Sequence, residues 1–224
     1  IIALIAPLLL VATQPDLGTS ILIAAGGIVV AWLAGVRIKF FVYSSIVFLS
    51  LLPVAISFLK PYQKSRILTF LNPERDPLGA GYQIIQSKIA IGSGGLFGKG
   101  FLNGSQSYLD YLPEKHTDFI FTLFSEEFGF FGSLSILLLY ALIISRIVKI
   151  GTLTRSTFGK LYCYSFATAF FIYVVVNMMM VLGLLPIVGS PLPIMSYGGS
   201  SMMAIMFGLG IVMSCKIHKD TPVN

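Results

Sequence analysis

Charged residues are scarce in this sequence: 11% of its 224 residues are Asp, Glu, Lys or Arg, whereas 56% are hydrophobic. That scarcity excludes an ordinary water-soluble domain, in which about a quarter of the residues are charged. The hydrophobic residues also gather in runs of about 20, the length that an α-helix needs to cross a bilayer. The sequence therefore predicts an all-α polytopic integral membrane protein.

Cysteine and histidine are scarce too, with two of each. Cys163 and Cys215 lie in different apolar runs without the spacing of a metal or redox motif, so we expect them to pack in the interior or against lipid. One well-placed histidine and scattered carboxylates supply no metal-ligand set, and no Ser/His/Asp arrangement stands out. We therefore predict no metal site built by the protein alone and no nucleophilic triad.

The formal net charge of +6 does not indicate nucleic-acid binding. The basic residues are dispersed and stand mostly at the ends of apolar runs, where lipid phosphate and membrane topology explain them. The chain starts at Ile1 without a Met or a basic leader, and its first apolar run, 1–11, is too short to span a bilayer. We expect a single membrane domain over residues 1–224 that forms the C-terminal part of a longer protein.

Six membrane helices are expected, the first of them truncated. Their approximate ranges are 1–11, 20–36, 40–59, 117–147, 161–185 and 196–215. Residues 60–116 form a long polar loop, and structureless loops of such length are usually functional. Basic residues mark the loops after residues 36 and 146 and the C-terminal tail, so the positive-inside rule places these in the cytoplasm and the 60–116 loop outside it.

The stretch 109–129, LDYLPEKHTDFIFTLFSEEFG, places five acidic residues and a histidine beside an apolar run. Pro113 breaks any helix before it and Thr117 is a good N-cap, so Asp118 is expected in the first helical turn. If hydrocarbon begins near Phe128, this helix lifts Asp118 about 15 Å above it. A deeper helix would bring Asp118 to the lipid phosphates, where it could bind a cation. The purely structural alternative is that Asp118 complements the helix dipole.

Helical periodicity places Asp118 at the outer end of a stripe of small and polar residues. Glu126 lies near the edge of this stripe and Glu127 points away from it, so we expect only Glu126 to share a cleft with Asp118. The other members of the stripe are Thr122, Ser125, Gly129, Gly132 and Ser133.

The segment 81–100, GYQIIQSKIAIGSGGLFGKG, begins with Gln86 and Lys88 interleaved among isoleucines, a pattern typical of a short amphipathic helix on the membrane surface. The glycines that follow could present backbone N–H groups to a phosphate, with Lys88 or Lys99 adding charge. A simple turn is the favoured alternative, because neither P-loop nor dinucleotide spacing is present. Further on, Asn177 and the Ser196 end of the last helix are interpreted as packing features, although Ser196 could line the same cleft as Asp118.

Four motifs together resemble the SEDS (shape, elongation, division and sporulation) family. The segment QSKIAIGSGGLFGKG, together with Lys88 and Lys115, resembles the elongation branch of the family more than its division branch. The resemblance implies ten membrane helices, of which the first four and part of the fifth are absent from this sequence. The motifs are QPDLGTS at 14–20, NPERDPLGAGYQIIQSKIAIGSGGLFGKG at 72–100, LPEKHTDFIF at 112–121 and GLLPIVGSPLPIMSYGGSS at 183–201.

The resemblance also implies an activity: a peptidoglycan glycosyltransferase that polymerises lipid II on the outer face of the bacterial cytoplasmic (inner) membrane during cell elongation. The implied partners are a class B penicillin-binding protein and other membrane proteins of the elongation complex. The family's essential aspartate matches Asp118. The remaining candidate substrate contacts are Gln86, Lys88, Lys99, Glu114, Lys115, His116 and Ser196.

The chemistry agrees with one essential carboxylate. Transfer from an α-linked sugar pyrophosphate to a β-linked glycan is a single inversion with a good leaving group, so one base suffices. Asp118 would take the proton of the acceptor's 4-hydroxyl, and lysines would neutralise the pyrophosphate. A divalent cation, Mg²⁺ or Mn²⁺, could share that task.

Two other functions stay open. A lipid II flippase or other transporter would need polar groups within the membrane, for which Asn177 and the pair Glu126 and Glu127 are the candidates. A non-enzymatic scaffold of the elongation complex would need no such groups.

Overall fold

The computed structural model describes residues 6–7, 10–11, 17–57, 61–76, 79–105 and 116–220. Over these residues the chain is helical and contains no strand, which confirms the all-α prediction. The elements are α2 (Leu17–Leu33), α3 (Ile38–Ser57), α4 (Pro61–Leu71), the 3₁₀ helix η1 (Pro73–Arg75), α5 (Ala80–Ser93), α7 (Ile120–Leu153), α8 (Thr157–Val181) and α9 (Gly199–Ile217).

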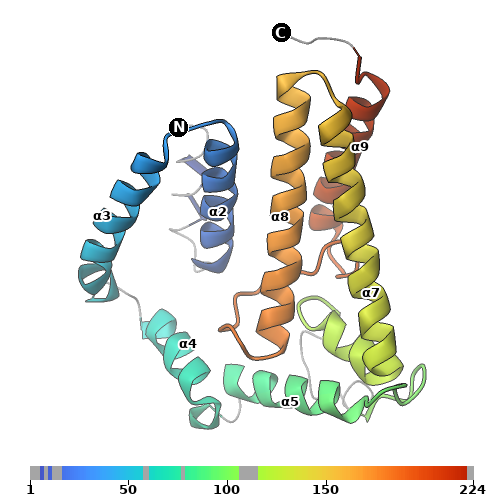
Figure 1. Ribbon diagram of the computed structural model, residues 1–224. Coiled ribbons are helices and arrows are strands. Elements are labelled where there is room, and N and C mark those ends of the chain that lie inside the picture. Colours follow the sequence, from blue (N-terminus) through green and yellow to red (C-terminus); the bar gives the residue numbers. More distant parts are fainter. Residues whose placement is uncertain are drawn as a thin grey trace.

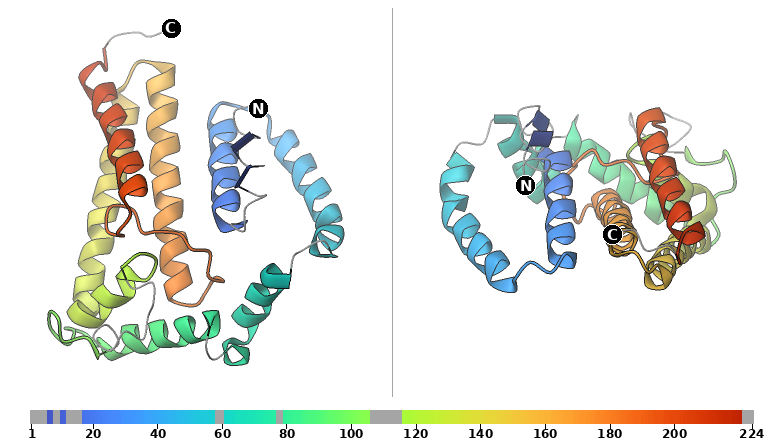
Figure 2. Two further views of the ribbon diagram at one scale, coloured as in Figure 1. Left: turned by 180° about the vertical axis from the view of Figure 1, so that it is seen from behind. Right: turned by 90° about the horizontal axis from the view of Figure 1, so that it is seen from above.

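The helices α7, α8 and α9 stand side by side as a bundle, with α2 against the other flank of α8 and α3 outermost (Figures 1 and 2). The helices α7, α8 and α9 are long and apolar enough to cross a membrane, whereas α2 and α3 contain the shorter apolar helices Gly18–Leu33 and Ile38–Leu51. Five of the expected spans are therefore found as helices. Most of the first, 1–11, lies outside the described residues.

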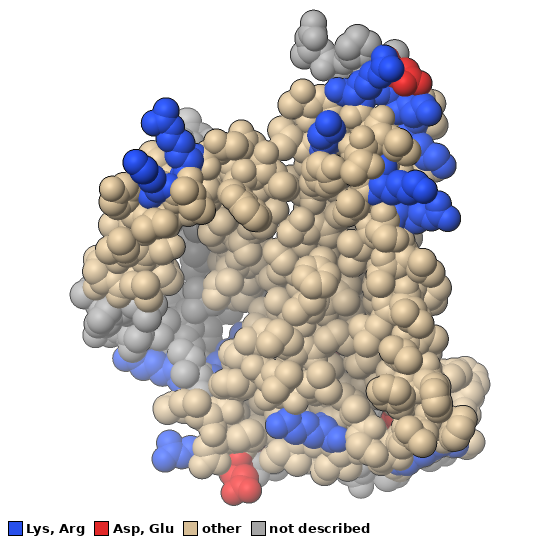
Figure 3. Space-filling model, viewed as in Figure 1, with Lys and Arg blue, Asp and Glu red and all other residues tan. Residues whose placement is uncertain are grey.

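The largest group of basic side chains lies at one end of the molecule, around the α2–α3 turn, the α7–α8 turn and the end of α9, and further basic side chains lie at the opposite end (Figure 3). The helices α4 and α5 lie at the opposite end, where α5 runs across the ends of α7 and α8 (Figure 1). This arrangement agrees with the expected alternation of basic and non-basic loops. That the α4–α5 end faces away from the cytoplasm stays a prediction.

The predicted amphipathic helix of the 60–116 loop is α5. One face of α5 is buried against α7 and the end of α8, and Lys88 lies on the exposed side. Ser87 fixes this contact, because its hydroxyl donates to Val181 O at 2.7 Å and lies 2.7 Å from Thr122 Oγ1. The helix α4 in the same loop was not predicted. The buried residues of α5 are Gly81, Ile84, Ser87 and Ala90.

Two hydrophobic clusters hold the bundle together. The larger lies towards the α5 end, and the smaller lies towards the basic end and contains Cys163, which is fully buried. Both cysteines are free, as the packing interpretation predicts. The larger cluster comprises Phe119, Phe121, Tyr140, Phe170, Val174, Met178, Met180, Val181 and Leu192.

Candidate active site

The start of α7 differs from the sequence prediction. Residues 116–119 form a turn, Phe119 is the N-cap, and the first helical residue is Ile120. Thr117 therefore does not cap the helix, and Asp118 precedes the first turn instead of lying in it. The physical reason is that the carbonyls of this turn bond to distant parts of the chain.

A break in α7 changes the depth of Asp118. At Gly129 the backbone turns to φ 66° and ψ −161°, and the short segment before the break runs in a different direction from the long one after it (Figure 1). The start of the short segment lies beside α8, where Asp118 O bonds to Asn177, about one turn before α8 ends at Val181. The expected height of about 15 Å above Phe128, which assumed a straight helix, is therefore wrong.

The segment 94–100 supplies hydrogen-bond partners for the backbone groups at the break in α7. A helix end leaves carbonyls unpaired and a helix start leaves N–H groups unpaired, and buried groups of this kind need partners. Here each side of the break is paired with the backbone of this segment. The bonds are Lys99 N to Glu126 O and Gly100 N to Glu127 O, both 3.0 Å, Phe130 N to Gly95 O at 2.9 Å and Phe131 N to Leu96 O at 3.2 Å.

Glycine is required where these two backbones meet. Gly98 (φ 80°) and Gly129 (φ 66°) both occupy the left-handed region, and a Cβ on Gly129 would collide with the backbone N of Gly98. The turn interpretation of the glycine-rich segment is thus confirmed. The phosphate-cradle hypothesis is wrong for three of its N–H groups, because Gly98, Lys99 and Gly100 all donate to protein carbonyls.

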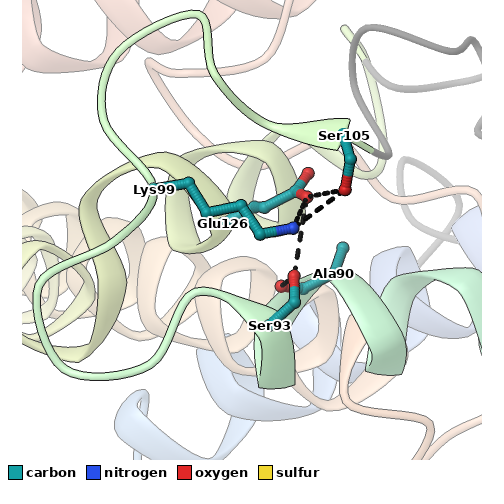
Figure 4. Close-up of polar contacts among 5 residues, drawn as sticks. All are labelled: Ala90, Ser93, Lys99, Ser105 and Glu126. Atoms are coloured by element: carbon teal, nitrogen blue, oxygen red, sulfur yellow. Dashed lines mark hydrogen bonds and ion pairs between the residues drawn. The ribbon is translucent and has the colours of Figure 1, made fainter.

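A buried ion pair fixes the same segment to α7 (Figure 4). Lys99 Nζ lies 2.7 Å from Glu126 Oε1, and the Glu126 side chain is 0% exposed. Ser105 Oγ donates to the same carboxylate oxygen at 3.1 Å and accepts from Lys99 Nζ at 2.8 Å. Lys99 therefore neutralises a protein carboxylate in this structure, so its predicted role at the substrate pyrophosphate would require the pair to open.

Three consecutive carbonyls clamp the turn that carries Asp118. His116 O accepts from Tyr197 N at 2.9 Å, Thr117 O from Ser196 Oγ at 2.6 Å, and Asp118 O from Asn177 Nδ2 at 2.8 Å. The last two donors lie 79 and 59 residues further along the chain. Long-range contacts therefore set the position of the aspartate.

The Asp118 side chain is half-buried and lies beside the α8–α9 connection. A Cβ added to Gly189 would come 3.6 Å from Asp118 Oδ2, so the carboxyl group faces that glycine. On the His116 side of the turn is a cavity of about 650 Å³. Its lining is His116, Ile120, Met195, Ser196, Tyr197, Gly198, Gly199 and Met202.

His116 and Ser196 both line this cavity, whereas Asp118, with which Ser196 was predicted to share a cleft, is not among its lining residues. The Ser196 hydroxyl is already used, since it accepts from Leu192 N at 2.6 Å and donates to Thr117 O. Lys88 is exposed on α5 with its ammonium end over Gly183, and Gln86 is half-buried on the same helix.

Glu114 and Lys115 lie outside the described residues. Within the described part of the chain, no group of three or more His, Cys, Asp and Glu could hold a metal ion.

The predicted polar stripe is only partly right. Ser125, Gly129 and Ser133 do share one side, because Ser133 Oγ donates to Ser125 Oγ at 2.9 Å across the break, and all three line a cavity of about 330 Å³. Asp118 is not in line with them, because α7 begins after it. Glu126 is bound by Lys99 and does not join Asp118 in the cleft that was expected.

Two structural residues were missed or undervalued at the sequence level. Ser87 was not recognised as a link between α5, α7 and α8, although a serine among isoleucines was the available signal. Asn177 was interpreted as polar glue, which is confirmed, but its contact with the Asp118 backbone was not foreseen.

Comparison with known proteins places the chain in a family. The family described as "Cell cycle protein" (FtsW, RodA, SpoVE) matches residues 1–221. The chain is 50% identical to peptidoglycan glycosyltransferase MrdB of Escherichia coli over 214 residues, 95% of this chain and 58% of that protein.

Two solved structures are also similar. A structure reported for the coordination of polymerization and crosslinking by a peptidoglycan synthase complex matches with a TM-score of 0.75 and 36% identity, covering 93% of this chain and 58% of that chain. Thermus thermophilus RodA matches with a TM-score of 0.62 and 25% identity, covering 97% and 55%. The chain thus spans just over half of the length of these relatives. The family match over residues 1–221 and the shared fold show that this multi-pass membrane protein belongs to the FtsW/RodA/SpoVE family, the SEDS proteins.

Proposed function

We propose that the protein is a peptidoglycan glycosyltransferase that polymerises lipid II into glycan strands during cell elongation, with Asp118 as the general base. The observation that carries this proposal is the half-buried Asp118, held at the α5 end of the bundle by hydrogen bonds to three consecutive backbone carbonyls. The names of relatives such as MrdB support the activity.

The reaction needs one base and a stabilised leaving group. The carboxylate of Asp118 accepts the proton of the acceptor's GlcNAc 4-hydroxyl as that oxygen attacks the anomeric carbon of the donor, with inversion. The donor's pyrophosphate departs with its electron pair, and cations near it lower the energy of the developing charge. Of the two predicted lysines that the structure describes, Lys88 is the better placed, because it is exposed at the α5 surface whereas Lys99 is paired with Glu126.

The depth of Asp118 is compatible with a second role for this residue, that of a cation ligand. The backbone of Asp118 bonds to Asn177, about one turn before α8 ends. We infer that the Asp118 carboxylate would lie closer to lipid phosphates than a straight α7 would place it. It could then help to bind a divalent cation, together with substrate oxygens. The two roles differ in the response of Asp118→Asn to added Mg²⁺ or Mn²⁺: a lost cation ligand is partly compensated by more metal, whereas a lost base is not.

The proposed setting is the bacterial cytoplasmic (inner) membrane. The proposed partners are a class B penicillin-binding protein and other membrane proteins of the elongation complex. The similarity to a peptidoglycan synthase complex, in which polymerisation and crosslinking are coordinated, supports a crosslinking partner.

Two of the three candidate polar residues for a transporter, Asn177 and Glu126, give no support to that alternative. The Asn177 amide bonds two backbone carbonyls, and Glu126 binds Lys99, so both are used to hold the fold. No feature of the described residues favours a flippase or a pure scaffold over the enzyme.

The test is polymer formation from purified lipid II by the full-length protein. We expect Asp118→Asn to lower the rate by at least about 10²-fold, the usual loss for a general base, at every metal concentration and without loss of folding. Asp220→Asn is the matched control, since Asp220 is exposed and paired only loosely with Arg155, at 3.9 Å. A wild-type protein that makes no polymer, or a near-normal Asp118→Asn, would refute the proposal.

A further inference from the structure

Asn177 joins three parts of the molecule through one side chain. It lies on α8, is 0% exposed, and its Nδ2 donates to Asp118 O at 2.8 Å and to Ser190 O at 2.7 Å. One amide therefore connects α8, the turn before α7 and the connection between α8 and α9.

The two acceptors also fix the orientation of the amide. Both are carbonyl oxygens, so the NH₂ group must face them and the reverse orientation would place an oxygen against two oxygens. The other end, Oδ1, has no hydrogen-bond partner among the described residues. A buried acceptor without a partner is destabilising, so the two donated bonds are what hold this side chain in place.

The bond to Asp118 O replaces support that a helix would give. The carbonyl of Asp118 precedes α7. The first two backbone hydrogen bonds at the start of α7, from Thr122 N and Leu123 N, both go to Phe119 O and not to Asp118 O. Asn177 supplies a hydrogen bond to the aspartate's own carbonyl. Because Asn177 is fully buried, it cannot touch a substrate in the cavity.

We propose that Asn177 is a positioning residue that sets the depth and direction of the Asp118 carboxyl group. This inference rests on the proposed function. Displacement of a reacting group by about 1 Å costs on the order of 10²-fold in rate. Loss of the hydrogen bond from Asn177 to Asp118 O is therefore expected to lower kcat by about 10²-fold. It is expected to leave KM within about twofold, because no substrate contact is removed.

The test uses two variants of the full-length protein. Asn177→Ala removes the amide, and Asn177→Asp keeps its size but replaces the donor by an acceptor; both are expected to show the kcat loss. Ser165→Ala is the matched control. Ser165 lies on the same helix as Asn177 but far from Asp118, and its buried hydroxyl has no partner among the described residues. If Asn177→Ala does not purify in a folded state, Asn177→Asp carries the test.

A double-variant cycle separates positioning from a general structural effect. In an Asp118→Asn background, where the base is already absent, Asn177→Asp should lower the residual rate no further, within about twofold. An unchanged kcat for the folded single variants, a loss confined to KM, or an equal fold-loss in the Asp118→Asn background would overturn the inference. A wild type without activity, or an active Asp118→Asn, would instead refute the proposed function, so the two failures are distinguishable.

Discussion

The ion pair of Lys99 and Glu126 gives the sharpest stability prediction. Replacing Lys99 by Met keeps the aliphatic stem and removes the charge, which leaves the Glu126 carboxylate buried at 0% exposure without its cation. Breaking a buried ion pair from one side costs about 3–5 kcal/mol. The Lys99 side chain is 29% exposed and Ser105 still donates to the carboxylate, so we expect the lower end of that range, about 3 kcal/mol.

The opposite replacement should cost less. Glu126→Gln removes the buried charge, and the freed ammonium of Lys99 can reach water through its flexible stem. We expect about 1–2 kcal/mol for the lost charge-assisted hydrogen bonds. In the double variant Lys99→Met/Glu126→Gln no buried charge is left unpaired, so its cost should be smaller than that of Lys99→Met alone.

Thermal unfolding of the purified full-length protein in one detergent measures the difference. At about 2–4 °C per kcal/mol, Lys99→Met should lower Tm by roughly 6–12 °C. Lys149→Met is the control, because Lys149 is exposed near the other end of α7, and its Tm should stay within about 1 °C of the wild type. If Lys99→Met behaves like this control, or if the double variant is the least stable of the three, the buried-charge reasoning fails.

Three further predictions concern the break in α7, the substrate and the topology. Gly129→Ala should destabilise the protein by more than about 2 kcal/mol, because its φ of 66° and its contact with the loop backbone both oppose a Cβ, whereas Gly26→Ala, in an open helical position, should be neutral or stabilising in the same thermal assay. Lys88→Gln should raise KM for lipid II by about tenfold with kcat less affected, and unchanged kinetics would reduce Lys88 to a membrane-interface anchor. A cysteine at exposed position Asn103, in a cysteine-free background, should react with an impermeant reagent in intact cells while one at Thr152 should not; the reverse pattern would invert the topology.

The membrane helices and the distribution of basic residues could be predicted from the sequence because both are local properties. A run such as 161–185 is apolar whatever surrounds it, and the observed helix α8, Thr157–Val181, agrees with it closely. The helix α5 was also predictable, because alternation of isoleucines with polar residues marks one buried face. The candidate aspartate itself was visible as a carboxylate beside an apolar run.

The geometry around that aspartate was decided only by the tertiary structure. Periodicity assumes one continuous helix, and a single glycine such as Gly129 in an apolar run does not reveal a break whose unpaired groups bond to the segment 94–100, about thirty residues earlier. The partner of Lys99 could not be predicted for the same reason, because Glu126 lies 27 residues away. Asp118 is held by donors 59 and 79 residues from the carbonyls that they bind, and local sequence fixes no contact over that distance. The sequence thus determined which carboxylate is the candidate for chemistry, and the packing of α8 and its following connection against the start of α7 determined where that carboxylate stands.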